Sequence, residues 1–216
     1  MSVSTSVLNL ALLLAAPDPP DAWRAVEADP PVDRTAVDAD RRLVARIQDG
    51  DADAFRTLME REFPVAVRFG TSIVHDREAA ADLAQDVFAK VWMHRAEWFP
   101  HTSPRAYLLG AVRHGAMNLV KHRAVRARYA TSGMALFEEV TEPVSTEVLE
   151  QTAELLALRQ AIARLPERRR MAIALRYEHG LSHAEVGVAL EISPKAAKEL
   201  LARTLSALYT ELRSLR

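Results

Sequence analysis

The segment Gly180–Pro194, with the sequence GLSHAEVGVALEISP, decides the fold of the C-terminal part of this chain. Gly180 can adopt the left-handed conformation that ends a helix, and Ser182 with a glutamate three residues later forms the pattern of a capping box. Ser193 followed by Pro194 indicates a second helix start, with an N-cap and a proline at the first helical position. The segment therefore predicts two short helices separated by a tight turn.

This arrangement is that of a helix-turn-helix, in which the second helix enters the major groove of DNA with its N-terminal residues. The residues predicted to contact DNA here are Ser193, Lys195, Ala196, Lys198, Glu199 and Arg203. Five arginines lie shortly before this segment in the sequence: Arg164, Arg168, Arg169, Arg170 and Arg176. A plain helical hairpin has the same spacing and stays open as an alternative, but the basic residues favour DNA binding.

The rest of the chain also has the periodicity of helices. From Asp40 onward apolar residues recur at spacings of three and four, and Gly50 interrupts the first run. The same patterns predict helices over about Arg77–Trp92 and Arg105–Arg128, and four more from Leu149 onward. Strand-like alternation is absent from the sequence. We therefore predict an all-α fold of two small helical domains joined by a flexible linker.

Proline, glycine and small polar residues set the predicted domain boundaries. Residues 1 to 38 combine five prolines with acidic residues and are predicted to be a disordered extension. The first helical domain is expected over residues 39 to 128 and the second over residues 149 to 216. Residues 129 to 148, which include Gly133 and Pro143, are expected to form the linker.

Charge is segregated along the chain although its net value is only −1. Between Glu97 and Glu138 there is no acidic side chain, whereas acidic and basic residues are almost equally common overall. A basic helix next to a loop that carries aromatic residues suits single-stranded or melted nucleic acid, because cations meet phosphates and rings stack on unpaired bases. A solvated basic face remains the alternative interpretation.

Several motifs, in order and spacing, resemble the sigma-70 family of transcription initiation factors, in particular its extracytoplasmic-function (ECF) subfamily. The segment Leu43–Phe55 is similar to the opening of the family's region two, and Ala81–Trp92 resembles its polymerase-binding helix. Pro104–Leu108, followed by Arg113, is similar to its promoter-melting segment, and Leu165–Arg170 resembles the lead into region four. The resemblance covers about residues 40 to 126 and 150 to 213.

The resemblance implies a division of labour between the two domains. Region two would bind the core RNA polymerase through Asp82, Gln85, Asp86 and Phe88. It would hold the melted −10 element through Trp98, Arg105, Arg113, His114, Asn118 and Lys121. Region four would recognise the −35 element as duplex. The implied partners are core RNA polymerase, promoter DNA and an anti-sigma factor, and we expect a cytoplasmic protein that is monomeric when free.

The sequence departs from the family pattern at several predicted contact positions. His114 and Asn118 stand where the family usually has Asn and Asp, so the contacts to the −10 element are expected to differ. Glu191 occupies a turn position that is often Gly, where a left-handed conformation would cost about 1 kcal/mol. In the recognition helix, Glu199 would repel phosphates, and Leu200 replaces a usual Arg. We therefore expect altered recognition of the −35 element.

Other functional classes have weaker support in the sequence. Asp82 and Asp86 could form an acid/base or metal pair, but no histidine has metal-binding spacing and no glycine-rich phosphate loop is present, so we expect no enzyme, metal site or cofactor. The apolar run Val7–Ala16 has no preceding Lys or Arg and is too short to cross a bilayer, so neither export nor membrane insertion is expected. A polymerase-independent helix-turn-helix regulator and a protein-interaction adaptor remain open.

Overall fold

The computed structural model describes residues 28–29, 33–130 and 153–214, and these residues contain helices but no strand. They form two compact domains. Residues 33–130 make up the first domain, and residues 28–29 together with 153–214 make up the second domain. The prediction of an all-α fold with two small helical domains is confirmed. The predicted linker lies mostly outside the described residues.

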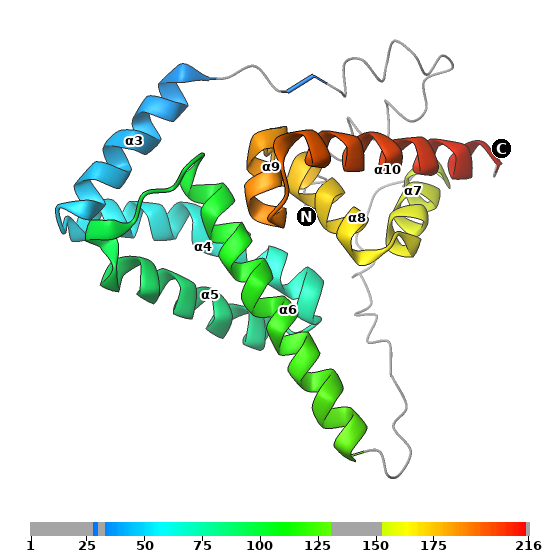
Figure 1. The fold of residues 1–216 in the computed structure, drawn as a ribbon, viewed down its shortest axis with the longest axis horizontal. Helices are drawn as coiled ribbons and strands as arrows, with labels where there is room; N and C mark the ends of the chain where they lie inside the picture. Colours follow the sequence, from blue (N-terminus) through cyan, green and yellow to red (C-terminus); the bar gives the residue numbers. More distant parts are fainter. Residues whose placement is uncertain (1–27, 30–32, 131–152, 215–216) are drawn as a thin grey trace. The chain divides into compact units, whose positions relative to one another are not determined.

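The first domain is a bundle of four helices and one short 3₁₀ turn (Figure 1). Its elements are α3 (Arg34–Gln48), α4 (Ala52–Val74), α5 (Arg77–Met93), η1 (Arg95–Glu97) and α6 (Pro104–Ala130). The long helix α6 crosses α4 and α5, and each of these three helices contacts the other two. Phe69, Phe88 and Leu108 are almost completely buried between these helices and form the centre of the core.

Aspartates begin three of these helices and explain where the helices start. Asp33 Oδ1 accepts the backbone N–H of Thr35 at 2.9 Å, and Asp51 and Asp76 cap α4 and α5 in the same way. Because Asp33 provides this cap, α3 begins at Arg34 rather than near Asp40. The predicted disordered extension is therefore wrong for residues 34 to 38.

A buried ion pair joins α4 to α6. The carboxylate of Glu62 is only 3% exposed, and the Arg105 guanidinium approaches both of its oxygens, at 2.8 and 3.2 Å. Arg61 adds a further contact at 2.8 Å. The charge of Glu62 is thus balanced by two arginines, as a carboxylate removed from water requires.

The second domain consists of α7 (Ala153–Arg164), α8 (Glu167–Ile173), the π-helical turn η2 (Ala174–Glu178), α9 (His183–Leu190) and α10 (Pro194–Ser214). The second of the four helices predicted from Leu149 onward is divided between α8 and η2. Helix α10 contacts α7, α8 and α9, so it is the central helix of this domain (Figure 1). Leu158, Leu175 and Leu208 fill its core.

The predicted helix-turn-helix is present as α9 and the first turns of α10. Gly180 has a φ of 71°, and Ser182 and Glu185 form the complete capping box. Glu191 is left-handed with a φ of 56°, as expected for its turn position. A Cβ atom on Gly187 would lie 2.8 Å from the carbonyl oxygen of Ile192, so the turn packs directly against this glycine.

Candidate nucleic-acid and protein interfaces

Three of the four predicted polymerase contacts form an exposed polar face on α5. Asp82, Gln85 and Asp86 are all exposed and are three or four residues apart, so they lie on one side of the helix. Phe88 is only 1% exposed and packs edge-on against Phe63, with ring centroids 5.8 Å apart. The first three residues are available to a partner, whereas the structure places Phe88 in the core beneath them.

The loop before α6 presents a different aromatic side chain from the predicted one. Trp98 is 4% exposed, its ring packs edge-on against Tyr107 at 5.8 Å, and its carbonyl accepts a hydrogen bond from Gln48 at 2.9 Å. In this conformation the indole cannot stack on a base. Phe99, which is 67% exposed, is the accessible ring of the loop.

Helix α6 carries the other residues predicted to contact the −10 element. His114, Asn118 and Lys121 are exposed at spacings of four and three, and form one stripe along the helix. Tyr107 lies seven residues before His114 and is 41% exposed, so it extends this stripe toward the loop. Tyr107 was not among the contacts predicted from the sequence, although its spacing of seven residues from His114 could have identified it.

Two arginines of α6 have partners inside the first domain. Arg105 is held by the buried Glu62, and Arg123 donates a 2.8 Å hydrogen bond to Asp76, the cap of α5. Arg113 is half-buried on the same helix. Arg105 therefore has a structural role in the first domain, which the sequence analysis did not predict.

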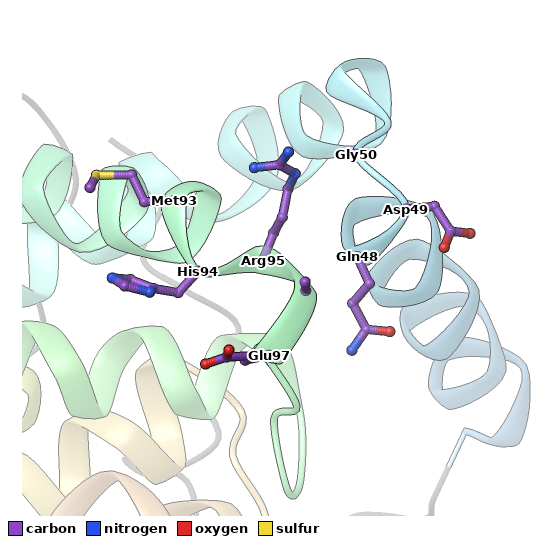
Figure 2. A pocket seen from close by; sticks show the side chains of 8 residues that line it. Gln48, Asp49, Gly50, Met93, His94, Arg95 and Glu97 are labelled. Atoms are coloured by element: carbon purple, nitrogen blue, oxygen red, sulfur yellow. The ribbon is translucent and has the colours of Figure 1, made fainter.

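A shallow pocket of about 290 Å³ lies where the C-terminal ends of α3 and α5 meet η1 (Figure 2). Figure 2 shows the Arg95 side chain extending from η1 toward Gly50. The Arg95 guanidinium also donates to the carbonyl of Trp92 at 2.9 Å and covers the Trp92 ring at 4.6 Å. Because the one arginine that lines the pocket is engaged with Trp92, we assign no ligand to this pocket.

The recognition helix α10 presents its predicted contacts to solvent. Lys195, Lys198, Glu199 and Arg203 are exposed, and Ala196 is half-buried. The Ser193 hydroxyl is used as the cap, because it accepts the backbone N–H of Ala196 at 3.1 Å. Ala197 and Leu201 are buried on the opposite side of α10 and fix its rotation against the domain. The polar side of the recognition helix is thus oriented outward.

A cluster that the sequence analysis missed lies at the start of α9. The Asp29 carboxylate contacts both the backbone N–H and the imidazole Nδ1 of His183, each at 2.7 Å, and the guanidinium of Arg176 lies 3.9 Å away. Burial lowers the pKa of His183 below its ordinary value, and Arg176 and Lys198 lower it further, whereas Asp29 opposes the shift. No sequence signal connects Asp29 with residues about 150 positions later.

Two searches of the described residues bear on the other functional classes. No group of three or more histidines, cysteines and acids in this part of the chain could hold a metal ion. Among the same residues, no helix combines the length and the apolar character needed to cross a bilayer.

Comparison with known proteins agrees with the two-domain geometry. Residues 58–126 match the family model described as Sigma-70 region 2, and residues 155–208 match the model described as Sigma-70, region 4. The first match covers most of α4 to α6, and the second covers the helix-turn-helix with the helices that support it. The chain therefore belongs to the sigma-70 family, whose members direct RNA polymerase to promoters and initiate transcription.

The relatives of this chain include extracytoplasmic-function (ECF) sigma factors. The chain is 29% identical over 154 residues to the RNA polymerase sigma factor CarQ of Myxococcus xanthus. This aligned region covers 71% of this chain and 86% of CarQ. It is 28% identical over 181 residues to the ECF RNA polymerase sigma factor BldN of Streptomyces coelicolor. This aligned region covers 81% of this chain and 68% of BldN.

A solved structure has the same fold. The structure of CnrH in complex with the cytosolic domain of CnrY superimposes with a TM-score of 0.57 at 22% identity, and the match covers 82% of this chain and 98% of CnrH. At this level of identity the similarity supports the fold.

Proposed function

We propose that this chain binds core RNA polymerase with α5, holds the melted −10 element with α6 and the loop before it, and recognises the −35 element with α10. The proposal describes binding without a chemical step, in the cytoplasm, where promoter DNA is found. One observation supports the proposal most directly. The same chain presents an acidic polar face and a basic aromatic stripe in the first domain, and an outward-facing recognition helix in the second.

The polymerase contact is assigned to Asp82, Gln85 and Asp86. These side chains are exposed on a helix whose opposite side, which includes Phe88, is anchored in the core. A rigid helix with a polar face gives a partner a surface of fixed geometry, and charge complementarity on such a face contributes to specificity. Phe88 supports this surface from below and is not proposed to contact the polymerase.

The contact with the melted −10 element is assigned to the stripe Tyr107, His114, Asn118 and Lys121, with Phe99 as the accessible ring of the loop. Exposed aromatic rings can stack on unpaired bases, and lysine can pair with phosphates. Of the residues predicted from the sequence, this set leaves out Trp98, which is buried, Arg105, which is held by Glu62, and Arg113, which is half-buried.

The contact with the −35 element is assigned to Lys195, Lys198 and Arg203 on α10, with Ala196 facing the groove floor. Glu199 lies 3.5 Å from Arg203, so part of its charge is balanced within the helix. This pairing reduces the expected repulsion between Glu199 and phosphates. Recognition of bases is therefore expected to depend on the first turn of α10, ahead of Glu199.

An anti-sigma factor is a proposed regulatory partner. The CnrH structure contains the cytosolic domain of CnrY, and another solved structure, with a TM-score of 0.57 at 20% identity, is that of the sigma factor RpoE with the anti-sigma factor NepR from Bartonella quintana. For this chain, the exposed acidic face of α5 is the surface that such a protein would cover.

The test is to mix the purified chain with bacterial core RNA polymerase, isolate the complex by size exclusion, and map transcript 5′ ends on genomic DNA. Discrete new start sites are expected. Asp86→Arg is expected to abolish the complex by reversing the charge of the α5 face. The matched control is Asp38→Arg, because Asp38 is an exposed acid in α3 of the same domain.

Full polymerase binding by Asp86→Arg would contradict the assignment of the α5 face. Failure of the unmodified chain to bind polymerase, together with binding to duplex DNA as a dimer, would favour a helix-turn-helix regulator that acts without polymerase. Binding of polymerase without any new start site would favour an adaptor.

A further inference from the structure

A carboxylate from outside the helix-turn-helix occupies the N-terminal end of α9. Asp29 Oδ1 accepts a hydrogen bond from the backbone N–H of His183 at 2.7 Å, and the imidazole Nδ1 lies at the same distance. Next to it, Arg176 donates to the carbonyl of Ala28 at 2.7 Å. These contacts join residues 148 and 154 positions apart in the sequence, and all of them lie within the second domain.

The protein groups around Asp29 form a site that favours an anion. We call the Arg176 guanidinium together with the imidazole and backbone N–H of His183 the anion site. Both side chains are only 9% exposed, and a 2.9 Å hydrogen bond to the carbonyl of Leu181 fixes Arg176 in place. A cation so far removed from water needs hydrogen bonds and an anionic partner. The N-terminus of α9 adds positive potential, part of which the Glu185 carboxylate offsets in the capping box.

The anion site lies at the end of the helix-turn-helix that approaches DNA. In this motif the first helix crosses the DNA backbone, and helix N-termini are frequent donors to phosphate oxygens. Lys198, on the outward side of α10, is close enough to influence the ionisation of His183. Helices α9 and α10 are in contact, so the anion site lies on the same helix-turn-helix as the proposed contacts with the −35 element.

We propose that the anion site accepts a backbone phosphate of duplex DNA, and that Asp29 of the same chain occupies it when DNA is absent. The proposal rests on the proposed function of the second domain. Because Asp29 and the phosphate would use the same donors of His183, docking of Asp29 and binding of that phosphate exclude each other. Asp29 thus acts as an intramolecular competitor, and the docked fraction sets the apparent affinity for the promoter.

The docking is tested first, without DNA, by NMR on the full chain. Asp29→Asn keeps the shape of the side chain and removes its charge. Because Asp29 is the group that raises the pKa of His183, while Arg176 and Lys198 lower it, this variant is expected to lower that pKa and to speed hydrogen exchange at the His183 amide. Asp38→Asn, which changes net charge equally on exposed α3, is expected to leave both unchanged.

The competition is then tested by fluorescence anisotropy with a −35 duplex at fixed salt. Asp29→Asn is expected to bind about three- to tenfold more tightly than the unmodified chain, which corresponds to a docked fraction of roughly two-thirds to nine-tenths. Asp38→Asn reports the effect of net charge alone and is expected to stay close to the unmodified chain. Equal affinities for Asp29→Asn and Asp38→Asn would overturn the proposal.

Two further outcomes separate this proposal from the proposed function. If the His183 signals respond to Asp29→Asn but no form of the chain binds duplex DNA, the DNA-binding role of the second domain fails and the competition fails with it, while the docking stands. Inorganic phosphate, titrated into Asp29→Asn and followed at the His183 amide, probes a free-anion site. Phosphate binding without any gain in duplex affinity would overturn the assignment to DNA.

Discussion

Acidic side chains stabilise the first domain, whereas the helix-turn-helix of the second domain begins its helices with uncharged serines. Asp51 and Asp76 cap α4 and α5, and Glu62 forms the buried ion pair with Arg105. In the helix-turn-helix, Ser182 and Ser193 provide the same hydrogen bonds to backbone N–H groups. Serine and aspartate are comparably good N-caps, so stability alone does not explain the difference.

The location of the caps explains why the helix-turn-helix uses serine where the first domain uses aspartate. The N-terminal ends of α9 and α10 are the ends that face DNA in a helix-turn-helix, and a carboxylate there would repel phosphates. A serine satisfies the helix N-terminus and leaves its positive potential available to an anion. Two acids do reach the N-terminal end of α9: Glu185, which belongs to its capping box, and Asp29, which comes from a distant part of the chain and, in the competition proposed above, can be withdrawn.

The largest expected effect concerns the acidic network of the first domain. Arg105→Ala removes the main partner of Glu62 and leaves a nearly buried carboxylate with Arg61 alone. We expect a loss of about 3 kcal/mol in the free energy of unfolding of the first domain. Chemical denaturation followed by the fluorescence of Trp92 and Trp98, in a Trp23→Phe background, measures it.

Lys121→Ala is the matched control on the same helix. Lys121 is exposed, so its removal is expected to change stability by less than about 0.5 kcal/mol while it weakens binding to the melted −10 strand. The opposite pattern, a stable Arg105→Ala protein with weak −10 binding, would return Arg105 to the DNA-contacting residues and contradict its structural role.

The second prediction tests why the helix-turn-helix has serine caps. Ser193→Asp retains the N-cap but places a charge at the DNA-facing end of α10. We expect duplex binding to weaken by about 1–2 kcal/mol, or roughly five- to thirtyfold, without loss of stability. Ser193→Asn, which has nearly the same shape and no charge, is the control in the same anisotropy measurement. Equal affinities for the two variants would show that this helix end does not face phosphate.

The sequence predicted the features that depend on local patterns. The periodicity of α5 gave its bounds to within a residue and placed Asp82 and Asp86 on an exposed face, because helix geometry fixes which positions share a side. The capping box at Ser182 was likewise predicted from neighbouring residues alone, whereas the strained turn position of Glu191 was identified from the family pattern. These features are encoded within a few positions of one another.

Tertiary partners could not be predicted in this way. Arg105 looked like a DNA-contacting cation because its partner, Glu62, is 43 residues away. Trp98 looked like an exposed ring of a loop, but in the fold its ring packs against Tyr107 and its carbonyl accepts a hydrogen bond from Gln48. Asp29 lies in a proline-rich segment with no helical pattern, so only the folded structure shows that it reaches His183.

The third prediction compares one feature that the two domains share. His75 ends α4 and Glu191 ends α9, both in the left-handed conformation, with φ values of 54° and 56°. Glycine adopts this conformation without the steric penalty of a side chain. We expect His75→Gly to stabilise the first domain and Glu191→Gly the second, each by about 0.5–1 kcal/mol, as measured by chemical denaturation. Destabilisation by either variant would show that its side chain makes contacts worth more than the strain.

The smallest expected effect is the response of the aspartate caps to acid. Hydrogen bonds from the backbone N–H groups of Ala54 and Ala79, together with Arg46 and Arg123, hold the pKa values of Asp51 and Asp76 below the ordinary value of 3.8. A carboxylate whose pKa is lowered by folding stabilises the protein above its unfolded pKa, and this stabilisation is lost as the pH falls through the folded value.

Serine caps do not titrate. The first domain is therefore expected to lose stability below about pH 4, and the double variant Asp51→Ser, Asp76→Ser should lose less over the same interval. Hydrogen exchange resolved by domain measures this, and an unchanged acid response in the double variant would show that other carboxylates, such as Glu62, control the unfolding.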